Sequence, residues 1–311
     1  MKNDPQVSGT VLMVRPSRFG FHAEAAESNS FASAAAGKDL GAALQEFDGV
    51  VAALDRAGVE VLVLDDSPDP AKPDAVFPNN WVSFHADGTM VTYPMATAAR
   101  RLERSPERLE ALLSSHGFEV RRVIDLSFHE RHGHFLEGTG SLVLDRPQRR
   151  AYANRSPRTD PVVIADFDDR LDYSTLLFEA NDRAGRPIYH TNVVLSLGTK
   201  FAVLCVDAVA PEYRELLAAE IEATGRSLMV VAYDQMRSFA CNVIELKGRE
   251  GEPVIALSSA ARATFTPAQL KQLESFGSLV EADIPTIERV GGGGLRCMIA
   301  DVHLPRISPA P

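Results

Sequence analysis

The chain has 311 residues, of which 45% are hydrophobic and 24% are charged, and it carries a net charge of −10 at pH 7. This composition is typical of a globular protein, and the negative charge argues against nucleic acid or an anionic membrane as a partner. The three cysteines are odd in number and far apart, unlike the disulfide framework of a small secreted domain. The polar N-terminal segment does not resemble a signal peptide and no apolar run is long enough to span a membrane, so we expect a cytoplasmic protein.

Strands and helices alternate in a regular order along the chain. The first predicted strand, VLMVRPS, begins at Val11, and the segment 18–38 after it, rich in small residues, is either a mobile lid or a plain surface loop. Four hairpins follow, each with a short apolar strand, a turn and a second apolar strand, and they begin at Asn79, Glu137, His190 and Cys241. Helices are predicted over 39–57, 105–116, 166–182, 211–224 and 266–276, and further short strands begin at Val59, Phe118 and Ser227.

The order strand, strand, helix, strand recurs about every 55–60 residues, which is typical of a repeat architecture. Two of the helices have a clear start signal, because Ser105 and Thr266 each place a capping hydroxyl before a proline. The segment RCMIADVHLP from Arg296 resembles a fifth first strand whose natural partner is VLMVRPS. We therefore predict one α/β domain over 11–306 with five ββαβ units around a pseudo-fivefold axis, and tails at 1–10 and 307–311.

In such a repeat, the residues that open each first strand meet at one end of the axis. These residues are Asn79, Asn80, Glu137 to Thr139, His190, Asn192, Cys241, Asn242 and Cys297. Cysteine, histidine and a carboxylate together can perform nucleophilic catalysis. Each also has a structural interpretation: Cys297 as a small buried apolar residue, His190 as a partly buried histidine, and Glu137 as a loop carboxylate. The run GGGG before Cys297 favours the catalytic interpretation, because glycine lets the backbone approach a ligand closely.

Two other polar clusters are candidate ligand sites. His129, His132 and His134 lie close together, but they have no neighbouring cysteine and their spacing fits no helical ligand pair, so we expect no metal. Arg158 in RSPRTD is either a solvated turn residue or a fork for a substrate carboxylate.

The motifs FPNNW, EGTGSLVLD, HTNVV and GGGGLRCM occur in an order and spacing that resemble the guanidino-group-modifying enzymes. This superfamily includes amidinotransferases, arginine deiminases and dimethylarginine hydrolases, and its fold is a five-bladed α/β propeller, the pentein fold. The resemblance covers about Val11 to Pro305 and is strongest to the bacterial amidinotransferase-like branch associated with citrulline and ornithine metabolism. It implies an enzyme that needs no metal or organic cofactor.

The resemblance also implies roles for individual residues. Cys297 would be the nucleophile, His190 the general acid and base, and Glu137 the carboxylate that orients the imidazole. Asp74 matches a position that binds the substrate α-amino group, and Arg100 and Arg158 match positions that bind the α-carboxylate. The remaining candidates for substrate binding are Asn79, Asn80, Thr139 and Asn192.

Three positions differ from the arginine deiminases. Those enzymes carry aspartate where this chain has Asn80, Asn192 and Gly140. A buried guanidinium without carboxylate partners would carry a large desolvation penalty, whereas amides serve a neutral ureido group well. We therefore expect hydrolysis of citrulline to ornithine, ammonia and carbon dioxide through a covalent cysteine intermediate. The alternatives are a hydrolase of arginine, dimethylarginine or succinylarginine, an amidinotransferase, and a non-catalytic propeller that binds an amino acid or a protein. The sequence is compatible with either a monomer or a homo-oligomer.

Overall fold

The computed structural model describes residues 4–34 and 40–307 of the chain. Within this part the strands form five three-stranded sheets with one common topology. In each sheet the middle strand pairs antiparallel with one neighbour and parallel with the other. The predicted repeat of strand, strand, helix and strand is therefore confirmed, since the parallel partner follows the repeat's helix.

The order of strands within each sheet follows the order of the chain except at the termini. The first sheet consists of β15 (Ala300–Asp301), β1 (Thr10–Arg15) and β2 (Glu60–Asp65). The other four are β3 (Val82–Phe84), β4 (Thr89–Thr92) and β5 (Arg122–Asp125); β6 (Leu142–Asp145), β7 (Arg150–Asn154) and β8 (Ser174–Phe178); β9 (Leu195–Leu197), β10 (Phe201–Leu204) and β11 (Ser227–Val230); and β12 (Ile244–Lys247), β13 (Pro253–Ser258) and β14 (Ser278–Ala282).

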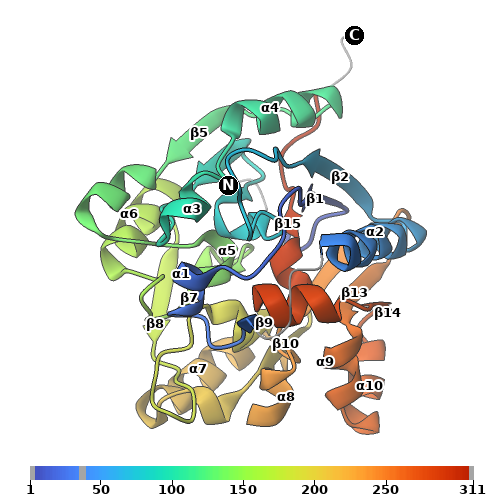
Figure 1. Cartoon of the computed structure of the whole chain (residues 1–311). Coiled ribbons are helices and arrows are strands. Elements are labelled where there is room, and N and C mark those ends of the chain that lie inside the picture. The colour runs from blue at the N-terminus through green and yellow to red at the C-terminus, as the bar shows by residue number, and fades with distance from the viewer. Residues whose placement is uncertain (1–3, 35–39, 308–311) are drawn as a thin grey trace.

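The two ends of the chain share one sheet, as the sequence predicts. β15 pairs antiparallel with β1, with Val11 opposite Asp301 and Leu12 opposite Ala300 (Figure 1). The segment 4–9, predicted as part of an N-terminal tail, instead packs into the fold. Asp4 is buried, and the Gln6 side chain donates to the carbonyls of Leu144 and Leu197.

The longest helix of each repeat lies between the middle strand and the strand that pairs parallel with it. These helices are α2 (Leu40–Arg56), α4 (Pro106–Ser115), α6 (Pro161–Leu171), α7 (Pro211–Ala223) and α10 (Pro267–Glu274). Each covers its sheet with apolar residues, such as Leu109 and Leu113 of α4, which are buried. Shorter helices are α1 (Ala23–Ala26), α3 (Ala98–Arg101), α5 (Gly138–Ser141), α8 (Tyr233–Arg237) and α9 (Ser259–Thr264).

The helix predicted over 166–182 is wrong at both ends. α6 begins earlier because the Asp160 side chain accepts a hydrogen bond from Val162 N and Pro161 occupies the first turn. It ends at Asp172, whose φ of 56° is left-handed, and β8 follows directly. The start signals at Pro106 and Pro267 hold, but only Thr266 caps through its side chain, whereas Ser105 makes no such bond.

Most residues predicted to open the first strands lie instead on single helical turns just before them. These turns are η2 (Pro78–Asn80), α5, η4 (Thr191–Val193) and η7 (Leu295–Met298), while Cys241 and Asn242 lie in a non-helical turn. Other short turns are η3 (Ser127–His132), η5 (Val206–Ala208) and η6 (Ile287–Gly291). Among the described residues, no helix is both long and apolar enough to cross a membrane. Residues 35–38 of the segment that could form a lid lie outside the described residues.

Candidate active site

Glu137, His190 and Cys297 are all buried, with exposed fractions of 0%, 1% and 3%. The Nε2 atom of His190 lies 2.9 Å from Oε2 of Glu137. The same Oε2 atom accepts from Nη1 of Arg158 at 3.2 Å, and Oε1 accepts from the backbone N–H of Ala96 at 3.1 Å. The carboxylate is thus fixed from three directions.

The charge states of this pair follow from its partners. Burial raises the pKa of Glu137, but the Arg158 charge and the hydrogen bond from His190 outweigh burial and hold that pKa well below its usual range. Burial lowers the pKa of His190 to about 4, although the hydrogen bond to Glu137 opposes this shift. At neutral pH the site therefore holds a carboxylate and a neutral imidazole, with the imidazole proton on Nε2 facing the carboxylate.

The Cys297 thiol lies between two amide side chains. Nδ2 of Asn242 is 3.4 Å from Sγ, and Nδ2 of Asn192 is 3.6 Å from it. Asn242 is held in this orientation because its Oδ1 accepts from the backbone N–H of Arg296 at 3.0 Å and its Nδ2 also donates to the carbonyl of Asn192. Burial raises the pKa of Cys297, while the Asn242 hydrogen bond and the Arg296 charge lower it, and burial prevails.

Asn80 is bound on both sides of its amide. Its Oδ1 accepts from Nη1 of Arg100 at 2.7 Å, and its Nδ2 donates to Oδ1 of Asn79 at 3.1 Å. Arg100 also forms a two-pronged pair with Glu103, at 3.0 Å for both bonds. Burial raises the pKa of Glu103 to about 7, although the Arg100 charge opposes the shift. Every guanidinium nitrogen of Arg100 therefore has a partner within the protein.

The N-terminal segment around α1 covers these residues. Arg158 donates from Nη2 to the carbonyl of Ala25 at 2.6 Å and from Nε to Oγ of Ser28 at 2.9 Å. Nδ1 of His22 lies 2.7 Å from Oδ2 of Asp74. Part of the segment that could form a lid is thus docked on two side chains that the resemblance assigns to substrate binding.

A pocket with about 270 Å³ of empty volume joins these groups; we call it the cysteine pocket. It is lined by Ala25, Asn29, Asp74, Phe77, Asn80, Arg100, Arg158, Tyr189, His190, Gly291, Gly292, Gly293 and Cys297. Asp74 is the one carboxylate among these lining residues, and Arg100 and Arg158 are two cations. The predicted residues Asp74, Asn80, Arg100, Arg158, His190 and Cys297 are therefore brought together.

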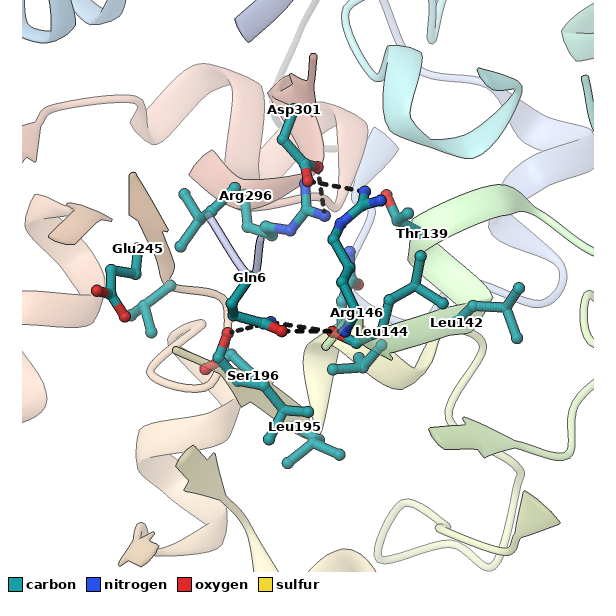
Figure 2. Close-up of a pocket in the computed structure, with 15 residues that line it drawn as sticks. Gln6, Thr139, Leu142, Leu144, Arg146, Leu195, Ser196, Glu245, Arg296 and Asp301 are labelled. Atoms are coloured by element: carbon teal, nitrogen blue, oxygen red, sulfur yellow. Dashed lines mark hydrogen bonds and ion pairs between the residues drawn. The ribbon is translucent and has the colours of Figure 1, made fainter. Parts of the chain in front are cut away.

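A second pocket, with about 510 Å³ of empty volume, has Arg146, Arg296 and Asp301 among its lining residues; we call it the arginine pocket (Figure 2). Thr139 and Asn192 line this pocket rather than the cysteine pocket. Asn79 lines neither, and its Nδ2 atom has no hydrogen-bond partner in the described part of the chain. Asn79 and Thr139 thus lie behind Asn80, with Oγ1 of Thr139 3.4 Å from the Asn79 carbonyl.

The glycine run before Cys297 is required by close packing. A Cβ atom at Gly291 or Gly293 would lie 2.8 or 2.9 Å from the ring of Phe77, and one at Gly294 would lie 2.6 Å from Oδ1 of Asn242. Gly292 has a φ of +67°, and its carbonyl accepts from the hydroxyl of Tyr189 at 2.6 Å. The run therefore brings the backbone against the walls of the pocket.

Two residues of the site have no role assigned from the sequence. Tyr189 lies beside His190, with ring centroids 4.5 Å apart, and Asn242 contacts the thiol. Asn242 could have been assigned a role, because it stands in its repeat where Asn192 stands in the preceding one. The histidine cluster is separate: His129 pairs with Asp166 and His134 with Asp160, and no three potential ligands converge in the described part of the chain.

The sequence pattern of the eukaryotic N,N-dimethylarginine dimethylhydrolase family matches residues 15–304. The chain belongs to this family. It is therefore a member of the pentein superfamily of guanidino-modifying enzymes, and this family consists of hydrolases that act on C–N bonds other than peptide bonds. No curated protein matches the sequence significantly.

Solved structures with low sequence identity share the fold. An arginine dihydrolase from the ornithine–ammonia cycle in cyanobacteria, ArgZ, superposes with a TM-score of 0.74 at 16% identity over 96% of this chain. The chain spans 41% of the length of that protein. The N-terminal domain of ArgZ was also solved alone, as a cysteine-to-serine variant bound to substrate, and this chain covers 99% of it with a TM-score of 0.73 at 17% identity. A dimethylarginine dimethylaminohydrolase adduct with S-methyl-L-thiocitrulline gives a TM-score of 0.66 at 15% identity, over 94% of this chain and 98% of that one.

Proposed function

We propose that this protein hydrolyses a neutral ureido amino acid, namely citrulline, to ornithine, ammonia and carbon dioxide. The observation that carries this proposal is the charge of the cysteine pocket. Its lining has two arginines and a single carboxylate, Asp74, which is already bound by His22. A substrate guanidinium would approach Asn80 beside the Arg100 cation without an unshared carboxylate, whereas a ureido group meets amides that donate and accept.

The reaction uses Cys297 as nucleophile. Its thiolate attacks the ureido carbon, the bond from that carbon to the ornithine nitrogen breaks, and a carbamoyl group remains on Sγ. The released amine takes up one proton from water. Neutral His190 then accepts a proton from water as the water attacks the carbamoyl carbon, and the thiolate leaves. The resulting carbamate separates into ammonia and carbon dioxide. Glu137 keeps the imidazole oriented and in the required tautomer.

The amino-acid end of the substrate would occupy the mouth of the pocket. Asp74 binds the α-amino group, and Arg158 binds the α-carboxylate by exchanging the Ala25 carbonyl for a substrate oxygen on Nη2. We assign Arg100 to holding Asn80, because all of its nitrogens have protein partners. Asn80 contacts the ureido group from the wall of the cysteine pocket, and Asn192 contacts it beside the thiol, where its Nδ2 lies 3.6 Å from Sγ of Cys297. Asn79 and Thr139 support Asn80 from behind.

The five sheets close into a propeller around a pseudo-fivefold axis, supported by the pairing of β15 with β1 and by contacts of β15 with β3, β6 with β9 and β9 with β12. The enzyme is cytoplasmic, works without metal or organic cofactor and takes a small amino acid as its substrate.

The test is kcat/KM for citrulline, arginine and dimethylarginine, followed by the release of ammonia from the first two and of dimethylamine from the third, with ornithine and citrulline measured as co-products. The proposal predicts the highest value for citrulline, with one ammonia per ornithine. A higher value for arginine, with two ammonia per ornithine, would assign the same site to an arginine dihydrolase instead.

A further inference from the structure

Asn242 lies against the reacting sulfur but outside both pockets. The residue is 1% exposed, and its Nδ2 atom is 3.4 Å from Sγ of Cys297. It lines neither the cysteine pocket nor the arginine pocket. Gly294 leaves room for it, because a Cβ atom at that glycine would lie 2.6 Å from Oδ1 of Asn242. A substrate in the cysteine pocket would therefore meet the thiol without displacing this amide.

Two backbone groups fix the direction in which the Asn242 amide faces. A backbone N–H needs an acceptor, so the atom that binds the N–H of Arg296 at 3.0 Å is Oδ1. A carbonyl needs a donor, so the atom that binds the carbonyl of Asn192 at 3.0 Å is Nδ2. That carbonyl takes one hydrogen of Nδ2, and the second hydrogen remains for Sγ of Cys297. Turning the amide over would break both backbone bonds, so Asn242 presents a donor to the sulfur.

The amide of Asn192 is not fixed in this way. Its Nδ2 and Oδ1 atoms lie 3.6 and 3.8 Å from Sγ of Cys297, and neither has another hydrogen bond in the described part of the chain. Asn192 is therefore free to turn toward a substrate, as the proposed reaction requires. The Asn242 donor, by contrast, stays on the sulfur.

The charged side chains around the thiol are paired within the protein. The pairs are Arg158 with Glu137, Arg100 with Glu103, Asp74 with His22, and Arg296 with Asp301 in the arginine pocket (Figure 2). His190 is neutral at pH 7 because burial lowers its pKa to about 4, and Tyr189 is uncharged because burial raises its pKa well above its ordinary value. Burial also raises the pKa of Cys297, and the hydrogen bond from Asn242 is the largest effect that opposes this shift.

We propose that Asn242 is a catalytic residue that donates its Nδ2 hydrogen to the Cys297 thiolate. When the thiol ionises, its proton passes to water and the electron pair stays on Sγ, which makes the sulfur a charged and therefore stronger acceptor. The same donor stabilises the thiolate as it leaves the carbamoyl carbon in the second half of the reaction. This inference rests on the proposed function in taking Cys297 as the nucleophile. It suits a ureido substrate, because a neutral substrate brings no cation to the sulfur.

The test measures the rate of Cys297 alkylation by iodoacetamide against pH in the free enzyme, with the labelled peptide identified by mass spectrometry. The sulfur–carbon bond forms as iodide leaves, so the midpoint of the profile reports ionisation of the thiol, whereas easier access to a loosened site raises only the plateau. Asn242→Ala removes the donor and should raise the midpoint by about one pH unit, equivalent to an about tenfold smaller thiolate fraction at pH 8. The controls Asn181→Ala and Asn181→Asp, outside both pockets, should keep the wild-type midpoint.

Asn242→Asp separates a donor from a residue that only holds the Arg296 backbone. Aspartate has nearly the same size and keeps an acceptor for that N–H, but it places a carboxylate oxygen where the donor faced Sγ. The midpoint should therefore rise further than in Asn242→Ala, by about two pH units. A purely structural role would make Asn242→Asp the milder variant.

The inference is overturned if either variant keeps or lowers the wild-type midpoint, or if Asn242→Asp shifts it less than Asn242→Ala. Thermal melting checks that both variants fold. Should Asn242→Ala not fold, the comparison of Asn242→Asp with the wild type decides alone. Because no substrate is present, these outcomes are independent of whether citrulline is turned over.

Discussion

Gly140 lies directly beneath the imidazole of His190. A Cβ atom at Gly140 would lie 2.8 Å from both Nδ1 and Cε1 of that ring and 2.4 Å from Nδ2 of Asn80. Contacts this short do not occur between real side chains, so residue 140 has no room for a side chain. The position where arginine deiminases carry aspartate is therefore closed by packing in this chain.

Gly140→Ala should reduce kcat strongly while the protein stays folded. Overpacking at such a site costs about 1–3 kcal/mol of stability, and a displacement of the catalytic ring by about 1 Å lowers the rate on the order of a hundredfold. Gly49→Ala is the matched control, because Gly49 is exposed in α2 and a Cβ atom there would lie within 4 Å of no atom beyond its chain neighbours and the backbone of its own helix. The control should keep full activity, and thermal melting should show both proteins folded. Unchanged kcat in Gly140→Ala would show that the ring need not occupy its observed place.

Arg158→Ala should lower kcat as well as raise KM. The resemblance places Arg158 at the substrate carboxylate, remote from the reacting carbon, but its Nη1 atom lies on the same Glu137 oxygen that faces His190. We expect a loss in kcat/KM of about a hundredfold, equivalent to about 2.7 kcal/mol, with partial recovery in Arg158→Lys. Arg155→Ala, an exposed arginine in the same loop, should behave as the wild type. If Arg158→Ala raises KM but leaves kcat unchanged, Arg158 binds the substrate equally well in the ground state and the transition state and does not support His190.

The dependence of kcat/KM on pH, on its acid side, should show the pH at which His190 becomes protonated. The folded pKa is depressed from its ordinary value of 6.5 to about 4, so the proton-accepting form is present above pH 4 and is lost as the pH falls through that value. Protonation of His190 should therefore steepen the acid limb of the kcat/KM profile of the free enzyme below about pH 5, in addition to the gradual loss of the Cys297 thiolate. A decline centred near pH 6.5 would mean that His190 titrates as an exposed histidine and is not held neutral by burial.

Exchanging two amides for carboxylates should move substrate preference toward arginine. In Asn80→Asp combined with Asn192→Asp, a guanidinium gains charged partners and a ureido group loses two donors. The ratio of kcat/KM for arginine to that for citrulline should rise on the order of tenfold, equivalent to about 1.4 kcal/mol. The effect is limited because an aspartate at position 80 would also pair with Arg100. Asn181→Asp adds a negative charge outside both pockets and serves as the control. If the ratio in the double variant shifts toward citrulline, substrate preference does not depend on matching the charge of the pocket to that of the substrate.

The repeat and the grouping of the site were predictable from the sequence because both depend on local patterns. Alternating apolar segments and turn residues placed the hairpins, and equivalent positions in successive units placed Glu137, His190 and Cys297 at one site. The α6 boundary was missed although Asp160 and Pro161 carry the same cap-and-proline signal that located two other helices.

What sequence patterns could not supply are contacts between distant segments. Nothing in the sequence near Arg158 indicates that it donates to Ala25 and Ser28, more than a hundred residues away. The sharing of Asp301 by Arg146 and Arg296 likewise depends on closure of the first sheet by the last strand. The need for glycine at position 140 appears only when Asn80 and His190 are seen on either side of it.

In the proposed reaction Cys297 takes a carbamoyl group from a ureido substrate. The most direct measurement is the intact mass of the enzyme after rapid acid quench with citrulline, and in parallel with arginine, followed by mapping of the modified peptide. We predict a carbamoyl adduct on Cys297 with citrulline, absent in Cys297→Ser and retained in Cys205→Ala. An amidino adduct with arginine, together with no adduct from citrulline, would show that Cys297 reacts with a guanidinium and not with a ureido group.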